Sequence, residues 1–426
     1  SHWHTYGPAW MVKDKAYSQA HLPLAQQQTA IGHAVRFVYL MTGVAHLARL
    51  SHDDSKRQDC LRLWNNMAQR QLYITGGIGS QSSGEAFTSD YDLPNDTVYA
   101  ESCASIGLMM FARRMLEMEG DSQYADVMER ALYNTVLGGM ALDGKHFFYV
   151  NPLEVHPKSL KFNHIYDHVK PIRQRWFGCA CCPPNIARVL TSIGHYLYTP
   201  REDALYINIY AGNSMEVPVE NGTLRLRVSG NYPWQEQVTI AVESPQPVRH
   251  TLALRLPDWC TQPQIILNGE EVEQDIRKGY LHITREWQEG DTLNLTLPMP
   301  VRRVYGNPLV RHVAGKVAIQ RGPLVYCLEQ ADNGESLHNL WLPTDAPFTT
   351  FEGKGLFSHK ILIQAPGYRY EQSNPEQQPL WHYDSAPAKR QPQTLTFIPW
   401  FSWANRGEGE MRIWVNEEKH RHPEVG

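Results

Sequence analysis

Three cysteines and one glutamate of this chain are residue types that together can bind a divalent metal. Glu101 and Cys103 lie two positions apart, and the adjacent residues Cys181 and Cys182 follow far downstream. Three thiolates and one carboxylate can complete the tetrahedral shell that Zn²⁺ prefers. A coordinated thiol also loses its proton, and the thiolate is a nucleophile. The spacing is not that of a zinc finger, so the surrounding residues must decide whether the four act together.

Glu101 and Cys103 can face one ion only at a helix start or in a loop, because residues two apart point in different directions on a regular helix. Asp96 or Thr97 is a candidate N-cap just before them. Alternatively, Cys103 is a small buried hydrophobe and Glu101 a first-turn partner of the helix dipole. Taken alone, these two residues favour that structural interpretation.

The segment Gly178–Asn185, with the sequence Gly-Cys-Ala-Cys-Cys-Pro-Pro-Asn, favours metal binding over redox chemistry. Its two prolines cannot continue a preceding helix, and Asn185 can cap a helix that follows. The cysteines would then lie at a helix N-terminus, where the dipole favours thiolate. A dithiol oxidoreductase would normally show Cys-x-x-Cys beside a βαβ unit, and the sequence shows neither.

Three further residues are candidates for a binding or catalytic site, and two of them, Glu85 and Tyr149, have types that a sugar-cleaving site uses. Glu85 follows the glycine-rich run Gly76–Gly79, which lacks the Gly-Lys-Ser/Thr of a phosphate-binding loop. A protonatable carboxyl opposite a nucleophile assists the leaving group of a glycoside. His33 lies in an apolar stretch, where a buried ring must hydrogen-bond something, and Tyr149 can offer its hydroxyl to a sugar. Taken singly, the three are also explained as a solvated loop residue, a core histidine and a packing aromatic.

Length, charge and thiol usage narrow the class of protein. The 426 residues suffice for two or three domains, and 42% hydrophobic with 20% charged residues is an ordinary globular balance. A net charge of −4 without a long basic run disfavours a nucleic-acid or membrane-surface partner. No apolar run approaches the ~20 residues of a membrane span, and no secretory leader opens the chain. Because four of the seven cysteines cluster, we expect a reducing, cytoplasmic location.

The period of the hydrophobic residues changes near residue 200 and predicts two structural halves. Before it, apolar residues recur at three-to-four spacing, as in helices, and residues 33–50 are apolar nearly all round, as in a buried helix. From residue 205 they alternate, as in strands, and Asn221-Gly222 and Asn268-Gly269 predict hairpin turns. A break near Pro300 precedes further strands. The expected domains are 1–200, 201–302 together with 411–426, and 303–410.

Five runs of the sequence carry motifs of a known family, namely Gly32–Arg36, Tyr73–Ser80, Gly84–Phe87, Tyr99–Ser105 and Trp176–Asn185. With their Ala-Glu-x-Cys-Ala and Cys-Cys-Pro-Pro-Asn motifs, they closely resemble glycoside hydrolase family 127, whose type member is a bacterial β-L-arabinofuranosidase. The resemblance covers nearly the whole chain. It implies an (α/α)6 barrel of helices followed by two β-sandwich domains of jelly-roll type.

The resemblance also implies a site. The implied ligands of Zn²⁺ are Glu101, Cys103, Cys181 and Cys182. Cys181 matches the position of the nucleophile and Glu85 that of the general acid/base, while His33 and Tyr149 match positions that contact arabinose. The implied reaction is retaining hydrolysis of a terminal non-reducing β-L-arabinofuranose, with an arabinose-containing oligosaccharide or glycoside as substrate.

Some alternatives stay open. About six or seven helices are indicated, roughly half of what an (α/α)6 barrel contains, so we expect the chain to be the C-terminal two-thirds of such an enzyme, with an N-terminal segment of the same protein as a partner. Glu101 could instead be a carboxylate nucleophile beside a structural zinc. Other interpretations are a non-catalytic carbohydrate-binding protein with a structural zinc, a related glycosidase for another sugar, and a thiol oxidoreductase. Exposed sandwich domains are compatible with a homodimer.

Overall fold

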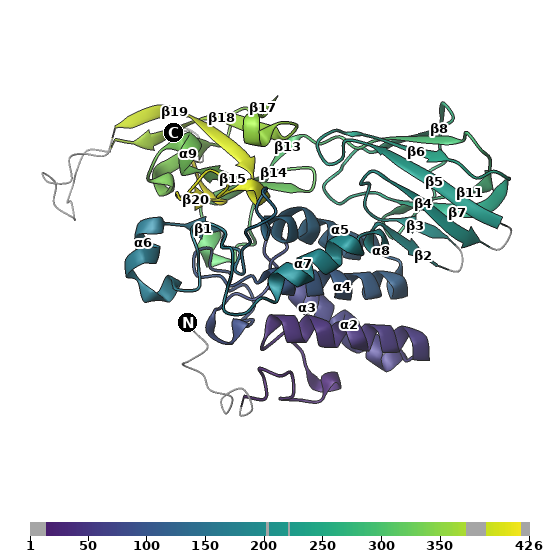
Figure 1. Cartoon of the computed structure of the whole chain (residues 1–426), viewed down its shortest axis with the longest axis horizontal. Coiled ribbons are helices and arrows are strands. Elements are labelled where there is room, and N and C mark those ends of the chain that lie inside the picture. Colours follow the sequence, from purple (N-terminus) through teal and green to yellow (C-terminus); the bar gives the residue numbers. More distant parts are fainter. Residues whose placement is uncertain (1–13, 202–203, 220–221, 372–388, 419–426) are drawn as a thin grey trace, which may run out of the picture.

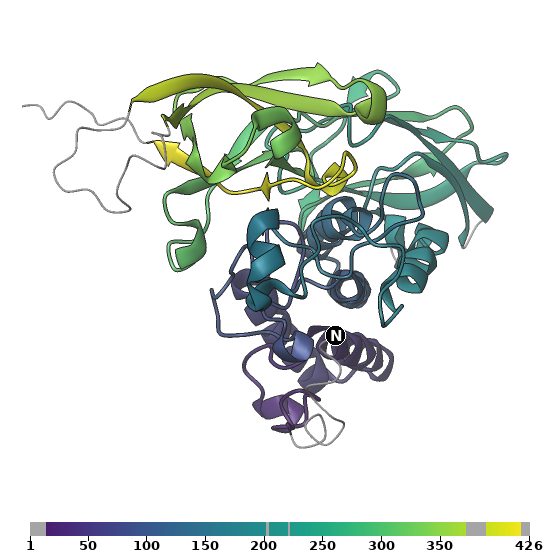
Figure 2. The same cartoon turned by 60° about the vertical axis from the view of Figure 1, so that its left-hand side comes forward.

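The computed structural model describes residues 14–201, 204–219, 222–371 and 389–418. Helices occupy the first half of the chain and strands the second, as the change of period predicts. The two β-regions lie side by side on one side of the helices (Figure 1). Figure 2 shows from a second direction that the last β-region, in green and yellow, covers the helical region. Within the described ranges, no helix combines the length and apolar character needed to cross a membrane.

The helical half contains most of the predicted elements. Its helices are α2 (Ala34–Ser51), α3 (Asp54–Arg70), α4 (Ser102–Glu119), α5 (Ser122–Ala131), α6 (Pro157–Phe162), α7 (Cys182–Thr191) and α8 (Gly194–Leu197). Shorter turns are η2 (Leu24–Gln26), η3 (Ser83–Glu85), the π-helical η4 (Leu132–Val136) and η5 (His164–Tyr166). The apolar periodicity predicts α2 to α5 and α7, whereas α6 is too short to show a period.

Helix α4 is the central element of this half and packs against α2, α5 and α7. At Gly107 of α4, a Cβ would come within 2.4 Å of Val38 of α2, so only glycine allows this close approach. The expectation that α2 is buried all round is wrong for one face, because α3 and α4 cover only the other. The exposed face carries Tyr39, Leu40, Leu47 and Leu50.

The first β-region consists of two sheets. One has the order β10-β11-β7-β3-β2, with β2 (Tyr198–Pro200), β3 (Leu205–Ile207), β7 (Val248–Arg255), β10 (Ile276–Arg277) and β11 (Tyr280–Trp287). The other has the order β4-β5-β6-β12-β8-β9, with β4 (Asn213–Val219), β5 (Gly222–Gly230), β6 (Gln237–Val242), β8 (Gln264–Leu267), β9 (Glu270–Glu271) and β12 (Thr292–Thr296). Buried side chains of both, such as Leu226 and Leu254, belong to one hydrophobic cluster, so the sheets share a core.

One of the two predicted hairpin turns can be checked in full. Asn268 and Gly269 have φ angles of 53° and 92° and join β8 to β9, which confirms this hairpin. Strands β4 and β5 also pair as a hairpin, with Val219 opposite Gly222. Asn221 of the turn between them lies outside the described residues.

The last β-region is one ten-stranded sheet. Its strands are β1 (Glu154–Val155), β13 (Val301–Val304), β14 (Lys316–Arg321), β15 (Leu324–Glu329), β16 (Leu340–Pro343), β17 (Thr349–Glu352), β18 (Ile361–Tyr370), β19 (Arg390–Pro399), β20 (Met411–Arg412) and β21 (Val415–Glu418). Between them lie α9 (Gln330–Asn333) and the 3₁₀ turns η6 (Arg311–Val313), η7 (Leu337–Asn339), η8 (Gly355–Phe357) and η9 (Trp400–Ser402).

Part of this sheet closes into a barrel. Strands β15, β19, β18, β16, β21 and β14 pair in succession, and β14 pairs again with β15. The prediction of a second sandwich is therefore wrong here. The physical reason is the tight turn at Gly322-Pro323, which makes β14 and β15 direct neighbours and so joins the two ends of the row of strands.

The expected pairing of residues 411–426 with the first β-region is also wrong in its described part. β20 pairs with β1 and β15, and β21 pairs with β14 and β16, all within the last sheet. There the alternating Met411, Ile413 and Val415 are fully buried, and residues 419–426 lie outside the described ranges. Strand β13 crosses the expected boundary at 302 and pairs with β14. Strand β2 includes Pro200, so the helical half ends at about α8.

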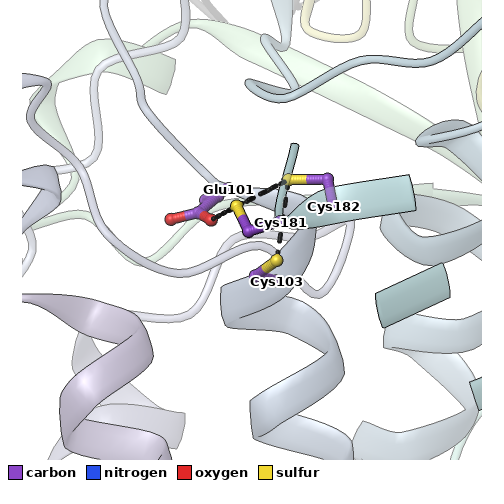
Figure 3. A group of neighbouring side chains, drawn as sticks. All are labelled: Glu101, Cys103, Cys181 and Cys182. Atoms are coloured by element: carbon purple, nitrogen blue, oxygen red, sulfur yellow. Dashed lines mark hydrogen bonds between the residues drawn. The ribbon is translucent and has the colours of Figure 1, made fainter. Parts of the chain in front are cut away.

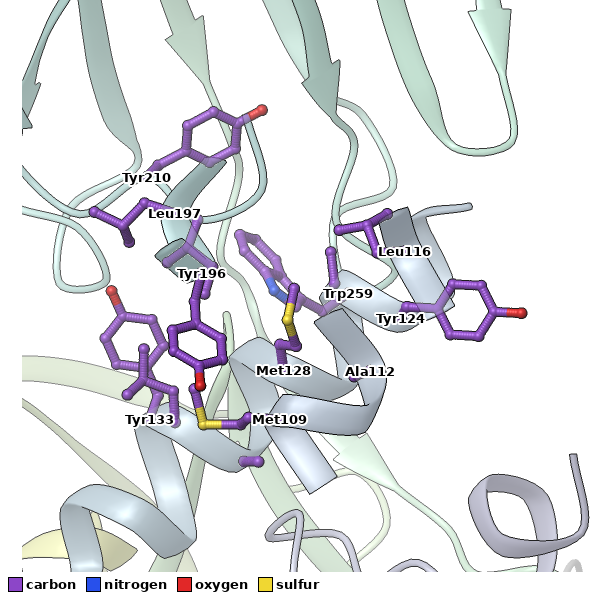
Figure 4. Packing of buried hydrophobic residues seen from close by; sticks show 14 of the residues in the cluster. Met109, Ala112, Leu116, Tyr124, Met128, Tyr133, Tyr196, Leu197, Tyr210 and Trp259 are labelled. Atoms are coloured by element: carbon purple, nitrogen blue, oxygen red, sulfur yellow. The ribbon is translucent and has the colours of Figure 1, made fainter. Parts of the chain in front are cut away.

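The helices and the first β-region share a continuous core. Met109 and Leu116 of α4, Met128 of α5, Leu197 of α8 and Trp259, which follows β7, all belong to one hydrophobic cluster (Figure 4). Burial of these large apolar side chains is the main stabilising contribution at this junction.

A buried ionic network crosses the same junction, and it predicts a loss of stability. Arg255 of β7 is fully buried and forms ion pairs of 2.6 Å with Asp126 and 2.6 Å with Glu129 of α5. Glu129 also accepts a hydrogen bond from the Trp259 indole and one from the Tyr232 hydroxyl. Since Arg255→Ala leaves two buried carboxylates without a cation, we expect the free energy of unfolding to fall by about 3 kcal/mol in urea titrations.

The matched control is Arg227→Ala, which removes an arginine from an exposed pair with Glu243. Exposed pairs contribute at most about 1 kcal/mol. Equal losses for the two variants would contradict a stabilising role of the buried network.

Candidate active site

The four predicted metal ligands meet where two helices begin. Glu101 is the N-cap residue of α4 and Cys103 lies in the first turn of that helix. Cys181 is the N-cap residue of α7, and Cys182 is the first residue of the helix. Figure 3 shows the four side chains, here called the cysteine–glutamate cluster, pointing toward one another. The structure therefore brings together residues that are distant along the chain.

The helix starts differ from those expected, for identifiable reasons. Neither Asp96 nor Thr97 caps α4, because Ala100 has a φ of 42° and Glu101 bridges to Val150, which delays the helix. Asn185 does not cap α7 either. The two prolines fit into the first turn, where a missing N–H leaves no hydrogen bond unmade, so the helix begins before them. The Asn185 side chain instead donates to the Tyr39 hydroxyl at 3.1 Å.

The spacing within the cysteine–glutamate cluster fits one metal ion. The Sγ atoms of Cys103 and Cys182 are 3.6 Å apart, and those of Cys181 and Cys182 are 3.7 Å apart. The Glu101 Oε1 atom lies 3.3 Å from the Sγ of Cys181 and 3.8 Å from that of Cys182. A tetrahedral zinc with Zn–S bonds of ~2.3 Å separates two sulfurs by about 3.8 Å. The Oε2 atom of Glu101 is buried without a hydrogen-bond partner in the described part of the chain.

The ionisation of the cluster also favours a cation. Burial, with the charges of Glu85 and Cys181, raises the pKa of Glu101 well above its ordinary value. Burial also raises the pKa of Cys182, whereas hydrogen bonds from Cys181 and Cys182 lower that of Cys103 to about 5. Burial and the neighbouring negative charges therefore oppose the ionisation of Glu101 and Cys182. A divalent cation would remove this conflict, so the donor set is suited to hold a metal.

A second group of side chains lies beside the cluster and shares Glu101 with it. His33, Glu85 and Glu101 each offer a ligand or proton-transfer atom within 4.8 Å of the others. The His33 Nε2 atom is 3.2 Å from the Glu85 Oε2 atom. The sequence predicts that His33 lies inside the helix, but the structure shows that it is the N-cap residue of α2. Its Nδ1 atom accepts the Arg36 N–H. The imidazole is therefore anchored at one nitrogen and directed at Glu85 with the other.

The backbone that carries Glu85 is in an unusual conformation. Gly84 and Glu85 have φ angles of 71° and 51°, both in the left-handed region that a glutamate rarely adopts. Such strain persists only where the surroundings impose it, and it often marks functional residues. A cavity of about 440 Å³ opens beside this turn, with Tyr17, Gln81 and Phe87 among its lining residues. Glu85, His33 and the residues of the cysteine–glutamate cluster are not among the residues that line this cavity, so it adjoins the turn and not the site itself.

Contacts to Glu85 set the protonation of its carboxyl group. Burial is the largest single effect and acts to raise its pKa, whereas the hydrogen bond and charge of His33 act in the other direction. Hydrogen bonds from Tyr99 and Glu101 add to this effect. The pKa of Glu85 is therefore below its ordinary value, and the ligand-free side chain is a carboxylate.

Two tyrosines complete the site. The Tyr149 hydroxyl lies 3.2 Å from the Cys181 Sγ atom, so this predicted residue does reach the cluster. Tyr99, which the sequence reasoning missed, hydrogen-bonds Glu85 and packs edge-on against Tyr149. It is one of 21 tyrosines, and only its position two residues before Glu101 could have drawn attention to it.

Comparison with known proteins shows the family of this chain. A family model described as the catalytic domain of GH127 β-L-arabinofuranosidases matches residues 1–195. Models of the middle and C-terminal domains of the same family match residues 204–299 and 301–416. The chain belongs to glycoside hydrolase family 127.

Relatives in family 127 cover nearly all of this chain. A non-reducing end β-L-arabinofuranosidase of Bifidobacterium longum subsp. longum is 40% identical over 406 residues, which are 93% of this chain and 61% of that protein. The crystal structure of a GH127 β-L-arabinofuranosidase from Geobacillus stearothermophilus T6 is 47% identical, with a TM-score of 0.92 over 97% of this chain and 65% of the other. A GH127 β-arabinofuranosidase of known structure is 34% identical, with a TM-score of 0.85 over 95% of this chain and 63% of the other. The chain thus spans less than two thirds of the length of each.

Proposed function

We propose that the protein is a retaining glycoside hydrolase that removes terminal non-reducing β-L-arabinofuranose from oligosaccharides or glycosides. The observation that carries this proposal is the meeting of two chemically different groups at Glu101 in a family 127 chain. On one side lies the cysteine–glutamate cluster, and on the other the strained Glu85 with His33. A nucleophile and a carboxyl group that transfers protons are the two parts that a retaining glycosidase requires.

The cluster is proposed to hold Zn²⁺ through Glu101, Cys103, Cys181 and Cys182. The sulfur–sulfur spacing supports this choice, and three thiolates favour zinc over magnesium or calcium. When bound, the ion lowers the pKa of its thiol ligands and so keeps them deprotonated at neutral pH.

In the proposed mechanism Cys181 is the nucleophile, because it lies at the edge of the cluster and is only partly buried, whereas Cys103 and Cys182 are buried. Its sulfur attacks the anomeric carbon, and a C–S bond forms as the glycosidic C–O bond breaks. Glu85 donates a proton to the departing oxygen. Glu85 then takes a proton from water, the oxygen of that water attacks the anomeric carbon, and Cys181 leaves as a thiolate. Two inversions give net retention.

This cycle requires Glu85 to be protonated in the first step and ionised in the second. The ligand-free carboxylate is the form that activates water. A bound sugar would exclude water from the buried site, which disfavours the charged form and raises the pKa for the first step. His33 and Tyr149, which adjoin Glu85 and Cys181 respectively, are proposed to bind arabinose hydroxyl groups and fix the ring between them.

Finer features of the fold are part of the same proposal. The helices up to α8 are proposed to belong to an (α/α)6 barrel, and the two sheets that share a core to form a jelly-roll sandwich. The proposed domains are then the helical half, the sheets from β2 to β12, and the region from β13 to β21 with β1 attached.

The test is a hydrolysis screen with nitrophenyl glycosides of both ring sizes and both hands. We expect release from the β-L-arabinofuranoside, with the first-formed arabinose in the β-configuration by NMR. Zinc measured in the same protein should be bound at the cysteine–glutamate cluster and be lost in Cys103→Ser. An inverted product, or preferential cleavage of a pyranoside, would overturn the proposal.

A further inference from the structure

We propose that the protein has a second metal site, formed by His156, His338 and Glu410, that binds one divalent transition ion. The three residues offer ligand atoms within 4.8 Å of one another. They belong neither to the cysteine–glutamate cluster nor to the group formed by His33, Glu85 and Glu101. Here they are called the imidazole–carboxylate cluster.

The backbone places two of these ligands opposite each other. Strand β1 pairs antiparallel with β20, with Glu154 opposite Arg412 and Val155 opposite Met411. One step further along the same register, His156 follows β1 and Glu410 precedes β20, so their side chains are cross-strand neighbours. This places an imidazole of the helical half beside a carboxylate of the last β-region.

The third proposed ligand, His338, is positioned by Glu410. Glu410 accepts the backbone N–H of Ser336 at 3.1 Å and that of Leu337 at 2.8 Å, which fixes the start of η7. His338 is the next residue of η7, and its ring meets that of His156 edge-on at 5.9 Å. The loop that presents His338 is therefore attached to the carboxylate that would share the ion, so little ordering is required on binding.

His156 is paired with Glu154, and this contact also suits a metal ligand. His156 Nε2 lies 2.8 Å from Glu154 Oε1, which leaves Nδ1 as the ring nitrogen that can bind a metal ion. A carboxylate on the far nitrogen of a ligating histidine orients the ring and raises its basicity. The charge of Glu154 is already paired with Arg412 at 3.5 Å. Within the described residues, Glu410 takes part in no ion pair, so its charge is available to a bound cation.

The ligand types select the ion. Two imidazoles and one carboxylate suit Zn²⁺, Co²⁺ or Ni²⁺, whereas Ca²⁺ and Mg²⁺ prefer a shell of oxygens. Bound there, the ion would join the beginning of the segment from His156 to Cys181 to the last β-region. This is the segment that leads into α7 and the proposed nucleophile, so the ion would anchor one end of it.

The experiment loads the metal-free intact protein with Co²⁺ in steps and removes unbound ion. We expect two equivalents per chain by elemental analysis. Only the cysteine–glutamate cluster gives intense thiolate-to-cobalt charge-transfer absorption, so this band should saturate after one equivalent. In His338→Gln the total should fall to one equivalent with the band unchanged. His338 is exposed, so the replacement should not impair folding.

Two further variants make the outcome decisive. His156→Gln should behave as His338→Gln does. His359→Gln should retain two equivalents, because the exposed His359 pairs with Glu352 alone among the described residues. A single equivalent in the unchanged protein, or two in His338→Gln, would overturn the second site. Neither result would affect the proposed function, whose own failure would appear as a missing charge-transfer band.

Discussion

Replacing Cys181 by alanine is expected to abolish hydrolysis of β-L-arabinofuranosides, with kcat falling by about 10⁴-fold or more. The reason is that the C–S bond of the proposed first step cannot form, and loss of a nucleophile removes the whole covalent route. Of the three clustered sulfurs, this one is the least buried and lies against the Tyr149 hydroxyl. Steady-state kinetics on the nitrophenyl glycoside, with zinc content measured in parallel, would check the result.

The matched control for this variant is Cys60→Ala. Cys60 is also a free thiol, but it is buried in α3, and burial raises its pKa to about 12. Its removal should leave kcat close to that of the unchanged protein. If Cys181→Ala keeps its zinc and more than about a tenth of the original kcat, the sulfur is not the nucleophile, and the carboxylate of Glu101 becomes the leading alternative.

The four residues of the cysteine–glutamate cluster could be assigned to one site only through the resemblance to family 127, because Glu101 and Cys103 taken alone favour a structural interpretation. Paired cysteines beside two prolines indicate a helix start, and a helix does begin there. The position of the cap could not be predicted, since the start of α4 depends on the bridge between Glu101 and Val150. Such a contact between distant residues leaves no local signal.

Contacts between distant residues also determine the other features that the sequence did not predict. Alternation of apolar residues indicates a strand but not the strand with which it pairs. The closure of the barrel through β14 and the pairing of residues 411–418 could therefore not be predicted from the sequence. Apolar composition indicates that α2 packs, but not that helices cover only one of its faces. The imidazole–carboxylate cluster, assembled from three distant segments, is likewise visible only in three dimensions.

The identity of the nucleophile can be established by slowing the second step. Glu85→Gln is expected to lower kcat by about 10³-fold, within the range of 10²–10⁴ that general acid–base catalysis contributes. Its amide can neither protonate the leaving oxygen nor take a proton from water. With an activated aryl leaving group the first step needs little acid assistance, so the glycosyl-enzyme should accumulate. A burst of nitrophenol and a mass increase of one arabinosyl group on Cys181 are the measurements.

Added azide sharpens this prediction, because it attacks the glycosyl-enzyme without needing a proton acceptor. It should restore turnover of Glu85→Gln and yield the β-arabinosyl azide, whose configuration reports two inversions. Glu352→Gln provides the control, since Glu352 also pairs with a histidine, His359, but does so on the exposed surface. An adduct on Glu101 in place of Cys181 would make the carboxylate the nucleophile and leave the metal a structural role, because a carbon–sulfur bond would then take no part in the reaction.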